Sequence, residues 1–579
     1  MILLKDGVLQ VLPPQDPPVP CTECETEKDG AAKPQGQQPD GQQPEGKVCK
    51  YCGMINCTMP GHNGEVVENA EVEPSVMVHP GIPLGMAVPG VVLVIILTHI
   101  FVALSRRKGT PSAWRFDLLK WSGLKWLVKR SWFPMFAQAV PIGLFLLILG
   151  AGFFGSQRVY PMNNIAPVLT WTIWWALLIF LVVTGGSIFC AVCPWEGLSS
   201  LFTSRSVKTR VSPSSAGLKW PKVLSNIYPA MALFILLTWI ELGMAITKSP
   251  MKTALMALGF VVLAIVVALF FERRAFCRYL CLVGRVQGMY ALFAPIEVRS
   301  KSTDVCRTCT THECYKGSAQ AVGCPTSLFP GTLQENTYCT MCTECVRSCP
   351  HDNMTVNARP LAVDLAGTKR FRVDEAVFAI VLLALTSFHG LTMTPIWIEF
   401  TNSTAAKMNL GTNAIFTILM VLMMVWPIAL FWGAAGIARR MSGEPEVSTG
   451  KVFKAFAYSV LPIALFYHLA HNGMHFFMEA QHILPVLSDP FGWGWDLFGT
   501  AGKSYPPMMT LRNIWWLQLI LIVFGHVYSV VVSDRIARAV WKDRKAGIKA
   551  MTPLLATMVL YSCFSIWLIA QPMEMRSGM

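Results

Sequence analysis

The chain has 579 residues, of which 53% are hydrophobic and only 14% are charged. A soluble globular domain carries about 25% charged residues, so this composition excludes an ordinary soluble enzyme. The formal net charge of +14 would also suit a nucleic-acid surface, but the Lys and Arg residues lie mainly between apolar runs, where anionic lipid accounts for them and no nucleic-acid partner is expected.

The first 80 residues contain no apolar run long enough to cross a bilayer, and the stretch 33–47, rich in Pro, Gln and Gly, predicts a flexible linker. No signal peptide is evident at 1–10, so we expect the first apolar run to direct insertion. Two Cys-x2-Cys pairs flank the linker, at a spacing typical of a zinc or iron site; disulfides are the alternative in an oxidising compartment. These cysteines are Cys21, Cys24, Cys49 and Cys52.

Ten apolar runs follow, each long enough to cross a hydrocarbon core of about 30 Å. They are 84–104, 134–154, 168–189, 225–246, 253–272, 374–394, 412–435, 455–477, 513–533 and 551–571. Connecting segments rich in Lys and Arg alternate with segments poor in them, which predicts the basic ones in the cytoplasm and both termini outside it. The sequence therefore predicts a mainly α-helical, multi-pass membrane bundle, with five helices in 81–272, a long polar insertion at 273–373 and five helices in 374–579.

Two cysteine pairs stand at the ends of the third and fifth apolar runs, and both ends are expected at the cytoplasmic face. The four residues are Cys190, Cys193, Cys277 and Cys281. Four thiols that meet there could hold an additional metal centre or exchange electrons as dithiols. The alternative is two reduced, packed pairs that only shape turns.

The polar insertion holds the densest cysteine set. The segment 339–350 reads CTMCTECVRSCP, and this Cys-x2-Cys-x2-Cys-x3-Cys-Pro spacing lets a short loop hold one 4Fe-4S cluster while its last cysteine reaches a second. A second set lies at 306–325, where Cys-x2-Cys-x4-Cys precedes a Cys-Pro. The alternative to two 4Fe-4S clusters is two zinc sites, but the Cys-Pro endings disfavour zinc. Crossed ligation assigns Cys306, Cys309, Cys314 and Cys349 to one cluster, and Cys339, Cys342, Cys345 and Cys324 to the other.

Three segments of the insertion, together with the cysteine pairs at the preceding run ends, resemble membrane polyferredoxins of the NosR/NapH type, a group that includes CcoG-like accessory proteins. The segments read CRTCTTHECYKG, GCPTSLFPGTLQEN and CTMCTECVRSCP. The resemblance covers about 134–360. It implies a bacterial-type two-cluster ferredoxin domain in a bacterial inner-membrane electron carrier, usually linked to quinol or to a periplasmic reductase. The chain departs from this pattern because no flavin-binding domain precedes the helices and five further runs follow the clusters. The first cysteine pair is also one residue shorter than Cys-x3-Cys-Pro, and Leu282 replaces the second proline.

Histidines gather in the apolar runs of the second half. They are His389, His468, His471, His475 and His526. An intramembrane histidine needs a polar partner and marks a functional site by default. Counted along the helices, His389 and His471 share one height near the outer face, while His468 and His526 lie deeper. Each pair could hold a b-type haem; a quinone pocket and hydrogen bonds between helices are the alternatives.

These patterns predict an electron-transfer protein that passes electrons between cytoplasmic 4Fe-4S clusters and a membrane quinone or haem b, and on to a partner outside the cytoplasm. We expect membrane lipid, the quinone pool and redox partner subunits of a respiratory complex around it, and a quinol dehydrogenase-like role if it is an enzyme. The alternative, which the resemblance to accessory proteins allows, is a metal-handling or assembly factor that reduces a metal. No dinucleotide or phosphate-binding fingerprint is present.

Overall fold

The structure is a computed structural model that describes residues 2–5, 8–11, 78–104, 114–157, 163–203, 215–272, 274–318, 321–367 and 370–574. The chain divides into two units, 1–73 and 74–579. The described part of the first unit is an antiparallel hairpin of β1 (Ile2–Lys5) and β2 (Val8–Val11). The four N-terminal cysteines lie outside the described residues, so a metal site there stays a prediction.

Nine helices among the described residues of the second unit are long and apolar enough to cross a membrane. Nine of the ten predicted runs are thereby confirmed. The run predicted at 225–246 instead forms the 16-residue α7 (Tyr228–Gly243), which measures roughly 24 Å and is shorter than a typical hydrocarbon core. The nine helices are α1 (Leu84–Leu104), α3 (Trp132–Phe154), α4 to α5 (Ile165–Gly185), α8 (Pro250–Phe270), α14 (Val373–Thr392), α16 (Thr412–Ser442), α17 to α19 (Thr449–Ser488), α20 (Leu511–Val540) and α21 (Arg544–Ile569).

The helices differ in how deeply they are buried. In the stretch α17 to α19, 94% of the most apolar window is buried within the protein, against 22% for α1 and for α3. The helix α18 (Leu461–Glu479) packs closely against α20, α14 and α5 and so forms the centre of the bundle. Because α18 carries three of the predicted histidines, these side chains face protein rather than lipid.

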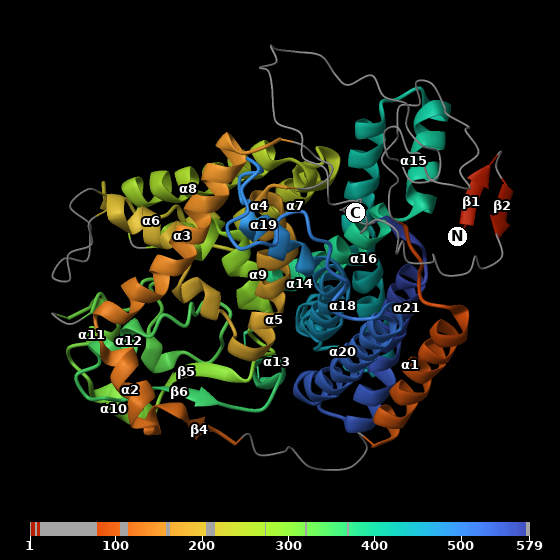
Figure 1. Cartoon of the computed structure of the whole chain (residues 1–579). Helices are drawn as coiled ribbons and strands as arrows, with labels where there is room; N and C mark the ends of the chain where they lie inside the picture. Colours follow the sequence, from red (N-terminus) through yellow and green to blue (C-terminus); the bar gives the residue numbers. More distant parts are fainter. Residues whose placement is uncertain are drawn as a thin grey trace, which may run out of the picture. The chain divides into compact units, whose positions relative to one another are not determined.

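The polar insertion folds around a small antiparallel sheet in which β6 lies between β4 and β5. Its core holds Val298, Met341, Val346 and Met354. Figure 1 shows its strands and short helices gathered beside the helical bundle. The elements are β5 (Ile296–Ser300), β6 (Met354–Ala358), α10 (Thr303–Thr308), α11 (Glu313–Lys316), α12 (Glu344–Ser348) and α13 (Val363–Gly367).

The sheet also recruits a segment from before the insertion. The strand β4 (Phe116–Asp117) pairs with β6, and the following α2 (Ser122–Lys129) packs against α12. Lys125 and Lys129 each reach Asp352 at 2.6 Å. These contacts place the segment after α1 on the same side of the bundle as the insertion, as the predicted alternation of basic segments requires.

The first and last strands described in the second unit also meet. The strand β3 (Val78–His79), which precedes α1, pairs antiparallel with β7 (Met573–Glu574), which follows α21. Both ends of this unit therefore lie on one side of the bundle, which agrees with the expectation that the first and last membrane helices have their outer ends on the same side.

Candidate metal and redox centres

The first predicted cysteine set surrounds a small pocket. Cys306 lies in α10, Cys309 caps its end, Cys314 lies in α11 and Cys349 follows α12, and all four line this pocket. Burial raises the pKa of the Cys314 thiol to about 12, and the charges of Cys349, Cys306 and Cys309 raise it as well. The structure therefore brings together the four thiols assigned to one cluster.

The second predicted set is gathered in the same way. Desolvation of the half-buried Cys345 raises the pKa of its thiol well above the ordinary value, and Cys342, Cys339 and Cys324 are close enough to raise it further. The loop before α12 turns tightly because Met341 and Thr343 both adopt positive φ angles, of 54° and 59°. Such left-handed residues let a short backbone present several side chains to one point.

Several N–H groups donate hydrogen bonds to the sulfur atoms of these sets. The Asn353 side-chain amide donates to Cys306 Sγ at 3.2 Å and its backbone N–H to Cys349 Sγ at 3.4 Å, while the Leu328 N–H donates to Cys324 Sγ at 3.4 Å. The backbone N–H of His312 is the main cause that lowers the pKa of Cys309 to about 7. Donors of this kind stabilise thiolates and tune the reduction potential of iron–sulfur clusters.

These observations test whether the eight cysteines fit two 4Fe-4S clusters. Two neighbouring groups of four thiols, with N–H donors directed at their sulfurs, are the donor set that such clusters use. Within the described residues, however, no three Cys, His, Asp or Glu side chains converge closely enough to hold a single metal ion. The donor chemistry fits, and the clusters themselves stay a prediction.

The four cysteines at the ends of the third and fifth runs also come together. Burial raises the pKa of the Cys193 thiol well above its ordinary value, and the charges of Cys281, Cys277 and Cys190 raise it further. Cys277 lies in a π-helical turn, Phe276–Leu280, and such turns are frequent at functional sites. Cys281 then caps α9, where its sulfur accepts a hydrogen bond from the Gly284 N–H at 3.3 Å. We call these residues the four-cysteine set.

The three groups of thiols are neighbours of one another. The charge of Cys314 in the first set reaches Cys345 in the second, and the charge of Cys339 in the second reaches Cys190 in the four-cysteine set. The buried Arg274 lies between the latter two groups, paired with Glu196 at 2.6 Å. The thiols of the insertion therefore lie within electrostatic reach of the four-cysteine set.

The helix α9 (Leu282–Tyr290) extends this series to the first histidine. It begins at the four-cysteine set and runs about 14 Å. At its end the Tyr290 hydroxyl lies 3.3 Å from Nδ1 of the buried His468, and the ring of Trp175 lies 6.5 Å from the same imidazole. Sequence inspection missed Tyr290 because it lies in a segment with no metal-binding spacing.

Three further histidines form a row near the far end of α14 and α18. The rings of His389 and His471 are 5.0 Å apart, and those of His471 and His475 are also 5.0 Å apart. His475 Nδ1 lies 3.4 Å from the Glu479 carboxylate, and both side chains are buried. The structure thus brings His389 and His471 together, as expected from their heights, and adds His475 to them.

His526 has its own partners. Its Nε2 lies 2.7 Å from the Thr98 hydroxyl and its Nδ1 lies 2.8 Å from the Ser562 hydroxyl. Both ring nitrogens are therefore occupied by side chains of α1 and α21. The structure does not bring His526 and His468 together as expected, because His468 lies against Tyr290 instead.

Two buried polar groups at the base of the insertion were not expected. The Arg359 guanidinium, fully buried, reaches Glu297 at 2.9 Å and Asp364 at 2.9 Å. Glu375, in the first turn of α14, accepts hydrogen bonds from Tyr338 at 2.9 Å and Tyr458 at 2.5 Å. The only sequence signal for the Glu375 group was an acidic residue at the start of an apolar run.

Part of the chain is similar to a known protein. Over 89 residues it is 32% identical to a protein of Escherichia coli (strain K12) named "Putative electron transport protein YccM". The similar segment covers 15% of this chain and 23% of that protein's length. No family model matches the chain, and no solved structure matches it.

Proposed function

We propose that the chain is a membrane electron-transfer protein. The polar insertion would be a two-cluster ferredoxin domain, with one 4Fe-4S cluster held by the set around Cys314 and the other by the set around Cys345. Such clusters supply one-electron exchange when they are bound. The multi-pass helical architecture and the partial similarity to a protein named for electron transport both support this role.

The observation that carries the proposal is the order of the thiol groups. The first set neighbours the second, the second neighbours the four-cysteine set, and α9 leads from there to His468. Electron transfer requires closely spaced centres, and this order would provide them. The four-cysteine set would act as a further metal or dithiol centre at the membrane face.

The membrane partner would be a quinone or a haem b near the histidines. His389 lies 16 residues beyond Val373, which starts α14 beside the insertion, so the histidine row is roughly 24 Å along the helix axis from that end. This distance is most of the thickness of a hydrocarbon core of about 30 Å. We propose that the row serves the face opposite the insertion, with the insertion in the cytoplasm of a bacterial cell and both termini outside the inner membrane.

The experiment that tests this function measures electron flow across a bilayer. The full chain, purified without oxygen, is placed in liposomes that enclose ferricyanide, and dithionite is added outside. We expect ferricyanide bleaching well above the rate of protein-free liposomes, lost in Cys345→Ser and kept in Cys563→Ser, a cysteine of α21 outside all three sets. Protein that contains clusters but bleaches no faster than empty liposomes would contradict the proposal and favour the metal-handling alternative.

A further inference from the structure

A cavity of about 170 Å³ lies in the first membrane half, directly beside the four-cysteine set. Its walls come from α3, α8 and the π-helical turn Val168–Trp174, and they are closed by Trp195 and Leu282. Trp195 stands two residues after Cys193, and Leu282 follows Cys281 directly. The cavity and the four-cysteine set therefore share the same two stretches of backbone.

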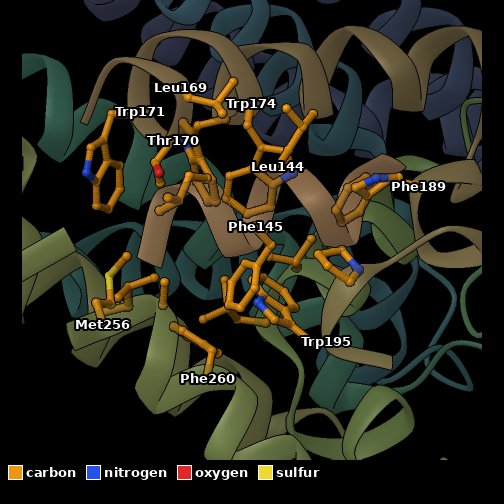
Figure 2. A pocket seen from close by; sticks show the side chains of 18 residues that line it. Leu144, Phe145, Leu169, Thr170, Trp171, Trp174, Phe189, Trp195, Met256 and Phe260 are labelled. Carbon is orange, nitrogen blue, oxygen red and sulfur yellow. The ribbon is translucent and has the colours of Figure 1, made fainter. Parts of the chain in front are cut away.

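The lining of this cavity is apolar and strongly aromatic. Of its eighteen residues, Thr170 alone is neither aromatic nor aliphatic nor a methionine, and four are tryptophans. Figure 2 shows the Thr170 hydroxyl among these aromatic and aliphatic side chains. An apolar cavity of about 150 Å³ holds a benzene-sized molecule, so this one has room for a single ring.

Two hydrogen-bond donors in the lining have no partner among the described residues. They are the hydroxyl of Thr170 and the indole N–H of Trp195, whose residues are only 5% and 6% exposed. Trp195 is held in place by stacking on Phe260, with ring centroids 5.3 Å apart. A buried donor without an acceptor is costly and rare. The two groups therefore call for an acceptor that a ligand brings into the cavity.

The surrounding helices connect this cavity with lipid. The helices α3 and α8 are among the least buried of the membrane helices, at 22% and 39% of their apolar windows. Leu144, which lines the cavity from α3, is itself 43% exposed. A ligand that arrives within the bilayer can thus reach the cavity from the side, without crossing the polar insertion.

We propose that this cavity binds the ring of a lipid-soluble quinone, whose carbonyl oxygens accept hydrogen bonds from Thr170 and Trp195. A quinone ring is flat and apolar, carries two acceptors and no donors in its oxidised form, and reaches protein from the lipid, which matches the size, lining, donors and position of the cavity. The proposal deepens the electron-transfer function, on which it rests for the redox role of the ligand. It moves the quinone from the histidines of the second half to the four-cysteine set of the first.

The test is the binding of decylubiquinone to the purified full chain, followed by quenching of tryptophan fluorescence, which needs no electron transfer. We expect Thr170→Val and Trp195→Phe each to weaken binding about 5- to 20-fold. Thr170→Val removes a donor that has no partner, so the thermal stability of the quinone-free protein should not fall. The matched controls are Thr184→Val, whose hydroxyl already bonds to backbone carbonyls, and Trp426→Phe, which is 63% exposed.

Unchanged affinity in both cavity variants would overturn the proposal, whether the quinone then binds at the histidines or a lipid chain fills the cavity. The same protein samples separate this failure from a failure of the proposed function. If iron–sulfur signals and electron flow are normal but the cavity variants bind quinone like the wild type, the cavity assignment alone is wrong. If the cavity variants bind quinone more weakly but the protein lacks iron–sulfur clusters, the cavity assignment is supported and the proposed electron-transfer function is wrong.

Discussion

The polar insertion and the second membrane half position their reactive side chains in different ways. In the insertion, Cys339, Cys342 and Cys345 are brought together by a loop of seven residues. In the membrane half, His526 meets Thr98 although 428 positions separate them in the chain. Short spacing therefore determines this run of thiols in the insertion, whereas the packing of whole helices determines which partner each histidine finds.

The largest expected effect is the loss of one thiol from the insertion. Cys345→Ser removes a half-buried thiol of the second set, so the anaerobically purified protein should hold about four iron atoms per chain instead of about eight. Iron and acid-labile sulfide analysis measures this. Cys563→Ser should leave the iron content unchanged, and an equal loss of iron in both variants would show that the motif spacing does not define the site.

The next effect concerns the buried charges beneath the insertion. Arg359→Met would remove the fully buried cation that contacts both the Glu297 and Asp364 carboxylates and would leave only Arg299 near both and Arg115 near Glu297. Loss of one partner from a buried ion pair typically destabilises a protein by about 3–5 kcal/mol. Limited proteolysis and thermal unfolding should both show a weakened insertion. Arg307→Met is the matched control, since its ion pair with Asp304 is exposed and such pairs contribute at most about 1 kcal/mol. Equal behaviour of the two variants would contradict the assigned role of Arg359.

A smaller, pH-dependent effect is expected at Glu335. Burial raises its pKa to about 7, and the charges of Glu375 and Asp364 add to this, whereas the unfolded chain has a pKa of about 4.3. The stability that this proton contributes is complete below about pH 4 and is lost as the pH rises through about 7. Glu335→Gln should therefore stabilise the protein by about 1–3 kcal/mol near pH 8 and much less near pH 5. Thermal unfolding at the two pH values measures this, and a gain of the same size at both would contradict the assignment.

The smallest effect separates the histidines from one another. Because both nitrogens of His526 bond to hydroxyl groups, His526→Leu should cost about 1–2 kcal/mol of stability and leave the optical spectrum of the reduced protein unchanged. His471→Leu, in the histidine row, should alter the spectrum if a haem is bound there. A changed spectrum of the His526→Leu variant would indicate that His526 is a cofactor ligand and would contradict this assignment.

The sequence predicted the parts of the molecule that depend on nearby residues. Apolar length predicted nine membrane helices correctly, and the tenth run forms α7, an apolar helix of 16 residues that is shorter than the other nine. Cysteine spacing works in the same local way for Cys339, Cys342 and Cys345, while the assignment of the cysteines to clusters stays a prediction. The sequence did not reveal that β4 joins the sheet of the insertion or that Tyr290 meets His468, since both contacts join segments more than 170 residues apart.

The cavity beside the four-cysteine set was likewise beyond prediction. Its lining comes from Pro141 through Val283, and its two donors belong to different helices. Neither Thr170 nor Trp195 has a spacing that marks it in the sequence. Only the packing shows that both residues line one cavity and that their polar atoms are buried with no hydrogen-bond partner among the described residues.

The most direct test of the account is the electron paramagnetic resonance spectrum of the anaerobically purified full chain before and after dithionite, with a pyridine haemochrome assay on the same sample. The account predicts about eight iron atoms per chain and the signals of two reduced 4Fe-4S clusters that interact because their thiol sets are neighbours. The haemochrome assay then shows whether a haem b is bound, as expected if the histidine row holds one. A protein that is folded but holds no iron–sulfur cluster would contradict the central claim.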